Sequence, residues 1–375
     1  MSKPLRYNGS NFFRQRLCLA TVSGRSVVIT NIRPNDEEPG LRDYEASFLR
    51  LLDKLCDGAD ISIDETGTML RYTPGQIIGG SNLAHNCPPS RNVTYFLEGL
   101  LLIAPLAKQP VSIRLRGVTN GGPDPSCDTF RTATLPLLAK FGLSDELVFK
   151  IVKRGALPLG GGEVVLNCPI LRVIQPVELL DEGKVKRVRG VAFTARVSPQ
   201  FAARMVDAAR GILNDFLPDV WIYTDPAKGG TSGDSPGYGV SLVAETITRS
   251  LKSADACAKI DDIEASGRGN QEDDLGTPEA VGTAAAKRLL AEIDLDGVVD
   301  TTHQAIVLYF LSLAEEIKPA RVRLSKLSPS AAQMLRHIKD FLGVAFQVRE
   351  DHGDTGTVVF SCLGAGLKNT SRRTF

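Results

Sequence analysis

Residues 154–164 read Arg154-Gly155-Ala156-Leu157-Pro158-Leu159-Gly160-Gly161-Gly162-Glu163-Val164, so that three consecutive glycines lead directly into a β-branched run. Glycine adopts positive φ without strain and lets another backbone or a phosphate approach closely. The run therefore indicates either a tight turn that feeds a strand or a loop that holds an anion through its amides. No Lys-Ser/Thr pair closes it, so it is not a Walker loop.

Composition limits the alternatives. The chain has 375 residues, long enough for two or three domains with substantial cores, and its 43% hydrophobic and 23% charged residues are ordinary for a globular protein. The formal net charge is only +1. Any nucleic-acid surface must therefore be a local patch, because the whole molecule has no excess of positive charge.

The cysteines and the apolar segments indicate where in the cell the protein is expected. Seven cysteines lie at least 31 residues apart, so there is no CxxC metal knuckle, and the odd number argues against a disulfide framework. The first residues lack the apolar core of a signal peptide, and the most apolar run, 95–107, is too short for a bilayer and contains Glu98 and Pro105. We expect a soluble intracellular protein without a membrane partner or a metal site.

Apolar periodicity repeats three times along the chain. Each repeat predicts the order helix, strand, helix, strand, strand. The expected fold class is α+β, with three units of a small sheet backed by two helices and one inserted, smaller α/β domain. The units are expected at 1–90, 91–183 and 286–375, and the insertion at 184–285. Helices are expected near 12–22, 41–56, 93–106, 126–140, 199–214, 302–315 and 330–342, with Ser126 and Ser328 as N-caps. Strands are expected at 26–32, near 61 and 69, and at 111–117, 147–152, 163–166, 190–196, 220–224, 240–244, 321–325, 344–348 and 357–362.

Several spaced motifs in this order carry a family resemblance. They are 39–42 (Pro-Gly-Leu-Arg), 117–120 (Gly-Val-Thr-Asn), 123–128, 154–164, 237–239 with 242–245, and 278–282. With them the sequence resembles the RNA 3′-terminal phosphate cyclases over nearly its whole length, and more closely their eukaryotic cyclase-like branch, which serves ribosome assembly.

The resemblance also identifies a degenerate nucleophile position. Active members of the family attach AMP to a histidine, which activates the RNA 3′-phosphate for attack by the neighbouring 2′-hydroxyl. Here Asp300 stands at the position of that histidine, and His303 at the position of the family's aspartate. Cyclisation is therefore expected to be lost. His303 is the alternative nucleophile, but we favour a histidine placed at a helix start that Thr301 or Thr302 caps.

A second departure lies near the first expected helix. The family's acidic, glycine-rich segment is replaced by 11–17, in which bulky Phe12 and Phe13 stand where small residues leave room for nucleotide. Two losses at one site predict a pseudoenzyme that uses no cofactor. Gly160, Gly161 and Gly162 could still hold an anion.

Basic residues supply candidates for contact with RNA phosphates. They are Arg114 and Arg116 on one expected strand, Arg321 and Arg323 on another, Arg336 and Lys339 on the last helix, and Arg154 before the glycines. They predict either a stripe that follows phosphates or an ordinary solvated face, and the sequence does not separate the two. His337 could act as a general acid or base but is more simply an incidental surface histidine. For Asp124 and Asp128 we favour a loop-and-cap role over magnesium binding.

The resemblance implies a function that the residues alone do not reveal. The protein is expected to be a ribosome-biogenesis factor without cyclase activity that acts in the nucleus, chiefly the nucleolus. It would support early pre-rRNA processing toward the small-subunit (18S-type) rRNA, inside a pre-ribosomal particle and bound to a ribosome-assembly GTPase. The alternatives are a pre-rRNA endonuclease and an active ATP-dependent cyclase.

Overall fold

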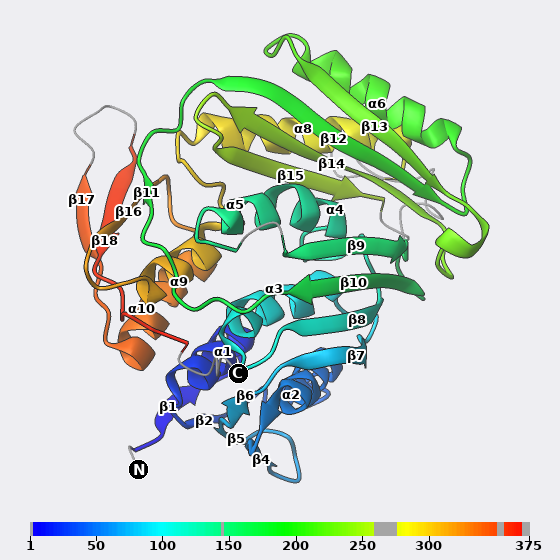
Figure 1. The fold of residues 1–375 in the computed structure, drawn as a ribbon. Coiled ribbons are helices and arrows are strands. Elements are labelled where there is room, and N and C mark those ends of the chain that lie inside the picture. The colour runs from blue at the N-terminus through cyan, green and yellow to red at the C-terminus, as the bar shows by residue number, and fades with distance from the viewer. Residues whose placement is uncertain (1–2, 144–145, 259–275, 351–355, 370–375) are drawn as a thin grey trace.

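The computed structural model describes residues 3–143, 146–258, 276–350 and 356–369 (Figure 1). Its described part contains four four-stranded sheets and one two-stranded sheet. In all four larger sheets, the first two strands along the chain pair in parallel and the other pairs are antiparallel. Three of them also share one strand order, in which the strands lie first, second, fourth and third across the sheet, whereas those of the inserted sheet lie second, first, third and fourth. This arrangement confirms the expected fold class of three repeated units and an inserted α/β domain.

The first unit has the strand order β1-β2-β5-β4. Its second helix buries Phe48, Leu51, Leu52 and Leu55, which follow helical spacing on one side. The bounds are β1 (Leu5–Asn8), α1 (Phe13–Ser23), β2 (Val27–Thr30), α2 (Asp43–Leu55), β3 (Cys56–Asp57), β4 (Asp60–Ile63), β5 (Leu70–Thr73) and β6 (Gln76–Ile77). Strands β3 and β6 form the two-stranded sheet.

The second unit has the order β7-β8-β10-β9. Its second helix begins after Ser126, whose side chain accepts from the Thr129 amide, as the expected N-cap should. The bounds are β7 (Gly80–Asn86), α3 (Val93–Ile103), η1 (Ala104–Leu106), β8 (Val111–Gly117), α4 (Cys127–Thr129), the π-helical η2 (Phe130–Thr134), α5 (Leu135–Ala139), β9 (Val148–Lys153) and β10 (Gly162–Cys168).

The third unit has the order β11-β16-β18-β17. Ser328 caps its second helix through the Ala331 amide, Pro329 occupies the first turn, and Gly343 ends the helix at a φ of 71°. The bounds are β11 (Glu178–Leu179), α9 (Gln304–Leu313), β16 (Ala320–Leu324), α10 (Pro329–Leu342), β17 (Gln347–Glu350) and β18 (Val358–Cys362).

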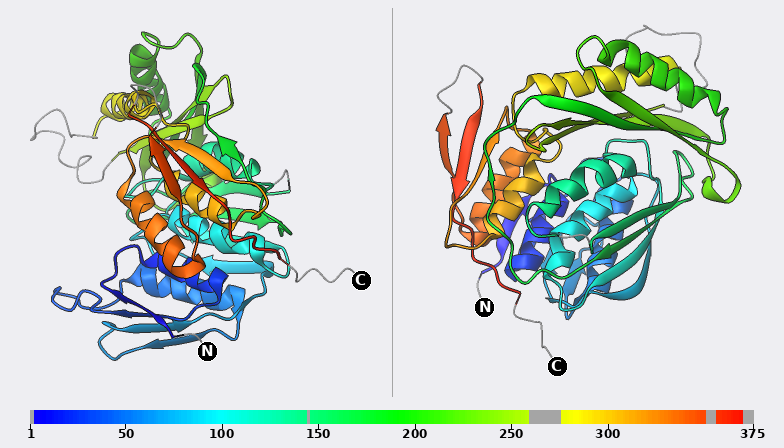
Figure 2. Two further views of the ribbon diagram at one scale, coloured as in Figure 1. Left: turned by 90° about the vertical axis from the view of Figure 1, so that its left-hand side faces the viewer. Right: turned by 45° about the horizontal axis from the view of Figure 1, so that its top comes forward.

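One apolar core joins the three units. Their helices pack on one another, α1 against α3 and α10, and α10 against α9, and lie between the sheets in both views of Figure 2. Tyr309 of α9 is fully buried and donates its hydroxyl to the Leu102 carbonyl of the second unit. None of the described helices is both long and apolar enough to cross a membrane.

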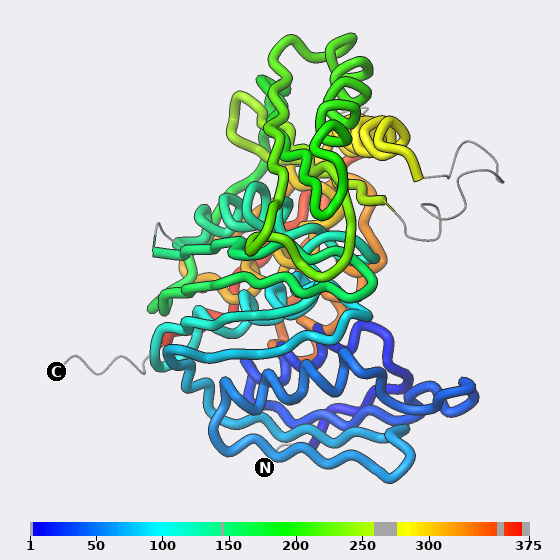
Figure 3. Tube along the Cα trace, turned by 90° about the vertical axis from the view of Figure 1, so that its right-hand side faces the viewer, coloured from blue at the N-terminus to red at the C-terminus, as the bar shows by residue number. Residues whose placement is uncertain are grey.

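The inserted domain has its own core and stands beside the three units, as Figure 3 shows from another side. Its bounds are β12 (Val185–Ala195), α6 (Gln200–Leu213), β13 (Val220–Ala227), η3 (Gly229–Thr231), β14 (Gly237–Thr246), β15 (Leu251–Cys257) and α8 (Pro278–Asp294). Helices α6 and α8 cover one face of the sheet, whose order is β13-β12-β14-β15. Because α8 runs past residue 285 and buries Leu289 in this core, we propose to place the domain boundary after Asp294.

Candidate functional site

Asp300 and His303 form a buried ion pair just before α9. The two residues are 1% and 4% exposed, and His303 Nδ1 lies 2.6 Å from Asp300 Oδ1. The other carboxylate oxygen accepts from the Ser253 amide at 2.8 Å and from its hydroxyl at 2.6 Å. His303 Nε2 lies 2.7 Å from Thr134 Oγ1. Both ring nitrogens and both carboxylate oxygens therefore have partners within the protein.

The two charges stabilise each other. Burial by itself disfavours both charged forms, but the charge and hydrogen bonds of His303 lower the pKa of Asp300, and Asp300 raises the pKa of His303. A nucleophile needs a free lone pair facing its substrate. His303 offers none here, so the arrangement argues against His303 as a swapped nucleophile.

The alternative placement of His303 at a helix start is confirmed, but the expected cap is wrong. His303 directly precedes α9, and its amide donates to Asp300 Oδ1 at 2.9 Å. Thr301 instead donates its amide and hydroxyl to Glu292 of α8. Asp300 therefore binds the amide of the residue that precedes α9, and no side chain caps the helix itself.

We expect His303 and His337 to give opposite pH dependences of stability. The pKa of His303 is raised above 6.5, so its contribution is present below pH 6.5 and is lost as pH rises through the folded pKa. Burial lowers the pKa of His337 to about 3, so its contribution is present above pH 6.5 and is lost as pH falls toward 3. His303→Gln should remove the decline in the free energy of unfolding above pH 6.5, and His337→Gln the decline below it. Urea unfolding of the wild type and both variants at several pH values checks this. The expectation is contradicted if the free energy of unfolding depends on pH in the same way in all three proteins.

His337 corrects the prediction of a surface histidine. It is fully buried, with Nδ1 3.2 Å from Gln15 Oε1 and Nε2 3.0 Å from Gln333 Nε2. The Arg16 guanidinium also donates to Nε2 at 3.4 Å. In this environment the ring cannot reach a phosphodiester.

A cavity of about 330 Å³ lies beside residues 10–15, in the segment for which the resemblance predicted a lost nucleotide site. Phe12 adopts a φ of 56° at its rim, and Phe13 is buried. The lining residues are Ser10, Asn11, Phe12, Phe13, Arg14, Gln15, Arg33, Tyr44, Glu45, Arg91, Tyr95 and Ser330.

The three arginines of this cavity each have a carboxylate partner. Arg14 pairs with Glu98, Arg33 binds both oxygens of Glu45 at 2.7 Å, and Arg91 pairs with Asp124. Asp124 is therefore an ion-pair partner and not simply a loop residue. Because each guanidinium is already neutralised, the cavity lacks the unpaired positive charge that a triphosphate would need.

The glycine run turns tightly into β10, and a carboxylate fills its outer side. Gly160 and Gly161 have φ of 69° and 71°, and the Gly160 amide donates to the Ala156 carbonyl at 2.9 Å. A Cβ on Gly161 would lie 2.1 Å from Asp234 Oδ2 of the inserted domain. The tight-turn alternative is thus confirmed. Anion binding by Gly160, Gly161 and Gly162 stays a prediction, and the carboxylate of Asp234 beside Gly161 argues against it.

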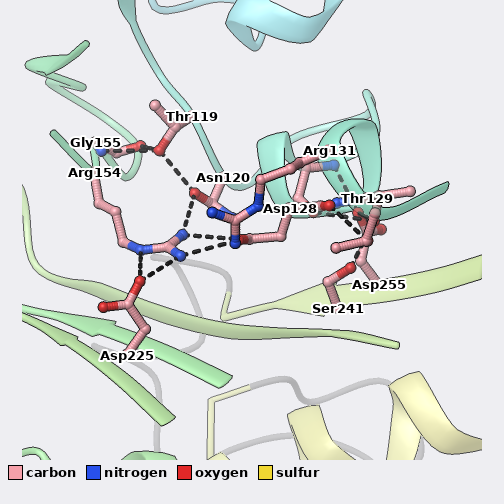
Figure 4. Close-up of polar contacts among 12 residues, drawn as sticks. Thr119, Asn120, Asp128, Thr129, Arg131, Arg154, Gly155, Asp225, Ser241 and Asp255 are labelled. Atoms are coloured by element: carbon pink, nitrogen blue, oxygen red, sulfur yellow. Dashed lines mark hydrogen bonds and ion pairs between the residues drawn. The ribbon is translucent and has the colours of Figure 1, made fainter. Parts of the chain in front are cut away.

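Arg154 is the largest correction among the candidate RNA contacts. Its side chain is 4% exposed and binds both oxygens of the buried Asp128, at 2.6 and 2.9 Å. It also donates to Asp225 of β13 at 2.7 and 2.9 Å (Figure 4). Burial alone would raise the pKa of Asp128, but the charge and hydrogen bonds of Arg154 lower it overall. Arg154 is not available to RNA; it joins the second unit to the inserted domain.

Further polar contacts extend this junction. Asp255 of β15 accepts from the Ser126 amide at 2.6 Å and from the Thr129 hydroxyl at 3.0 Å. The Thr129 hydroxyl also lies 2.8 Å from Ser241 Oγ of β14, as Figure 4 shows. Asp128 therefore serves in a buried network and not as the loop-and-cap residue that was expected. Sequence reasoning missed Asp225, Ser241 and Asp255, and no motif marked them.

The remaining basic candidates lie on three separate surfaces. Arg114 and Arg116 are exposed on β8, and both pair with Glu163, at 2.7 and 2.9 Å. Arg321 and Arg323 alternate on β16 with buried core residues, so they face away from the helices. Together with Arg349 of β17 they line a cavity of about 340 Å³.

Arg336 and Lys339 are exposed on α10, which covers the opposite face of that sheet. The single stripe that the sequence suggested is therefore divided among the surface of β8, the outer face of the third sheet and α10. Within the described ranges, no group of three or more His, Cys, Asp or Glu side chains could hold a metal ion.

Comparison with known proteins defines the class. The model of the RNA 3′-terminal phosphate cyclase family matches residues 5–348, and the chain belongs to this family. Within it, the chain is 47% identical over 374 residues to an RNA 3′-terminal phosphate cyclase-like protein of Mus musculus, covering 98% of this chain and 97% of the relative. A probable cyclase-like protein of Dictyostelium discoideum is 46% identical, covering 99% and 100%. The rRNA processing protein rcl1 of Schizosaccharomyces pombe is 40% identical and covers 98% of both chains.

Proposed function

We propose that this protein is a ribosome-biogenesis factor that acts in pre-rRNA processing without cyclising RNA. Its similarity to the cyclase-like proteins over nearly the full length of both chains, one of them an rRNA processing protein, supports the role in rRNA processing. One structural observation supports the absence of cyclase chemistry. Asp300 replaces the nucleophile, and it lies buried against His303 and Ser253 with all its lone pairs directed at protein donors.

The finer proposal follows the family resemblance. We place the protein in the nucleolus, in early processing toward the small-subunit rRNA, within a pre-ribosomal particle and bound to a ribosome-assembly GTPase. The net charge of +1 suits a protein that is held in a particle mainly by protein contacts and touches RNA locally.

Affinity purification of the tagged, full-length protein tests this proposal. We expect pre-rRNA, assembly proteins and a GTPase in the eluate, and no covalent AMP on the protein after incubation with labelled ATP, because no free nucleophile faces a nucleotide site. Recovery of the protein without pre-rRNA and assembly factors would overturn the role in ribosome assembly. An AMP adduct that His303→Ala abolishes would overturn the absence of cyclase chemistry.

Two charge-reversed variants then separate the RNA-facing candidates. One carries Arg321→Glu and Arg323→Glu on the sheet face, and the other carries Arg336→Glu and Lys339→Glu on the helix face. Each serves as the control for the other, because both change the net charge equally. The variant that reduces crosslinking to pre-rRNA identifies the contacting surface.

A further inference from the structure

We propose that the open face of the inserted domain's sheet binds single-stranded RNA, with Trp221 and Tyr223 as the stacking residues. The inference rests on the proposed role in pre-rRNA processing and adds a site to it. The proposed site is distinct from the cavity beside Phe12 and from the basic surfaces of the third unit. It lies at the opposite edge of the sheet from β15, whose Ser253 contacts Asp300.

The aromatic pair lies on β13, an edge strand of its sheet. Ile222 between them is buried under the helices, whereas Trp221 and Tyr223 point away from the helices and are 56% and 57% exposed. Their ring centroids are 6.0 Å apart, with an angle of 66° between the planes. The two rings therefore stand side by side on one face of the strand, and neither contributes to the domain's core.

This exposure is unusual for such residues. Trp221 is the only tryptophan of the chain, and an aromatic side chain offers a large apolar area that is normally buried. Other parts of the protein cover the rest of this sheet face. Ser241 and Asp255 on β14 and β15 contact α4, and Phe193 lies under Arg154, so the uncovered part is confined to the outer ends of β12 and β13.

Cationic side chains lie beside the two rings. Arg189 is directly opposite Trp221 in the register of β12 and β13, and Val191 is opposite Tyr223. Arg187 lies two residues before Arg189 on the same side of β12, and Lys184 and Lys186 are exposed at the start of that strand.

The local charge balance is positive. Asp219 holds the Arg189 guanidinium through two hydrogen bonds, of 2.9 and 2.8 Å, and Glu245 accepts from Arg187 at 2.8 Å. Two carboxylates thus pair with two of these four cations, and a third carboxylate on this face, Asp225, pairs with Arg154. In a single strand of RNA, the bases can stack on exposed rings and the phosphates can contact an excess of cations. This surface offers both features.

The surroundings of the rings favour RNA over a protein partner. The centre of a protein interface is depleted of charged side chains, and its anchors lie within an apolar patch. Here charged groups adjoin both rings. Arg189 is opposite Trp221, and Asp225 lies two residues after Tyr223 on β13. A four-stranded sheet with two aromatic residues on its open face is also the geometry by which sheets stack unpaired bases.

The single tryptophan makes the test direct. Titration of the full-length protein with a single-stranded oligouridine of about ten nucleotides should quench the fluorescence of Trp221, because a stacked base contacts the indole. Duplex RNA should quench it much less, and added salt should weaken the effect. Absence of quenching at concentrations where the oligonucleotide binds would overturn the inference.

Variants give a second readout by fluorescence anisotropy of the labelled oligonucleotide. Trp221→Ala and Tyr223→Ala should each weaken binding by about tenfold or more, whereas Tyr223→Phe should retain most of it. Phe216→Ala is the matched control, because Phe216 is 68% exposed in the same domain and lies between α6 and β13, not on a strand of the sheet. Unchanged affinity in Trp221→Ala, or loss of a protein partner from the purified particle with normal oligouridine binding, would overturn an RNA site here.

The two proposals fail in different ways. Pre-rRNA recovered with the wild-type protein, together with an unquenched Trp221, would remove only the stacking site. Quenching by oligouridine in a protein that recovers no assembly factors would remove only the role in ribosome assembly.

Discussion

Arg154→Ala is expected to lower the free energy of unfolding by about 3–5 kcal/mol, because it leaves a buried carboxylate without its partner. Asp128 is fully buried, and Arg154 supplies two of its hydrogen bonds. The same substitution also releases Asp225 of β13, so that the second unit and the inserted domain lose a direct link. Urea unfolding followed by circular dichroism measures the loss.

Arg131→Ala is the matched control for this variant. Arg131 approaches the same carboxylate at 3.2 Å, but its side chain is 42% exposed. Water can replace an exposed partner, so we expect a loss of at most about 1 kcal/mol. If Arg154→Ala and Arg131→Ala lowered the free energy of unfolding by similar amounts, the buried network of Arg154 would not be what stabilises this junction.

Gly155→Ala is expected to cost about 3 kcal/mol or more, although it adds only one methyl group. A Cβ at this position would lie 2.3 Å from the Gly162 amide nitrogen and 2.7 Å from the Gly160 carbonyl oxygen. Both are backbone atoms of the turn, so no flexible side chain can move aside, and the turn itself must distort. Thermal and urea unfolding should both report the loss.

Gly211→Ala provides a control of opposite sign. Gly211 lies within α6, and a Cβ there would meet nothing within 4 Å. Alanine in a helix is better than glycine by about 0.5–1 kcal/mol, so this variant should be slightly more stable than the wild type. Stability of Gly155→Ala close to that of Gly211→Ala would show that the turn is not tightly packed.

Much of the fold could be predicted because its helices and central strands carry strong periodic signals. Residues such as Phe48 and Leu52 in α2, and the N-caps Ser126 and Ser328, follow local rules that depend only on neighbours in sequence. The first strand of each unit was missed, as were β15 and α8 of the inserted domain. Strands β1, β7 and β11 are short or largely polar, and they are held by parallel pairing with a later strand, which leaves little local pattern.

The candidate site shows the same division between local and distant information. The segment with Asp300 and His303 was singled out from the sequence by its resemblance to one family motif. The burial of Arg154 could not, because its partners Asp128 and Asp225 come from a helix start and an edge strand of a different domain. The environment of His337 likewise depends on Gln15 and Arg16 of the first unit. A basic residue in a sequence does not reveal whether a carboxylate from elsewhere already neutralises it.

The pairing of β11 with β16 has a consequence for the order of folding. Glu178 is opposite Arg321 and Leu179 is opposite Val322, and the whole inserted domain lies between these partners in the chain. Contacts between residues so distant in sequence form late, because a long loop must close first. During synthesis the first two units and the inserted domain can therefore form before the third sheet is complete. The surface of α1 that α10 finally covers, and that of α3 where Tyr309 of α9 binds, would meanwhile be exposed to chaperones.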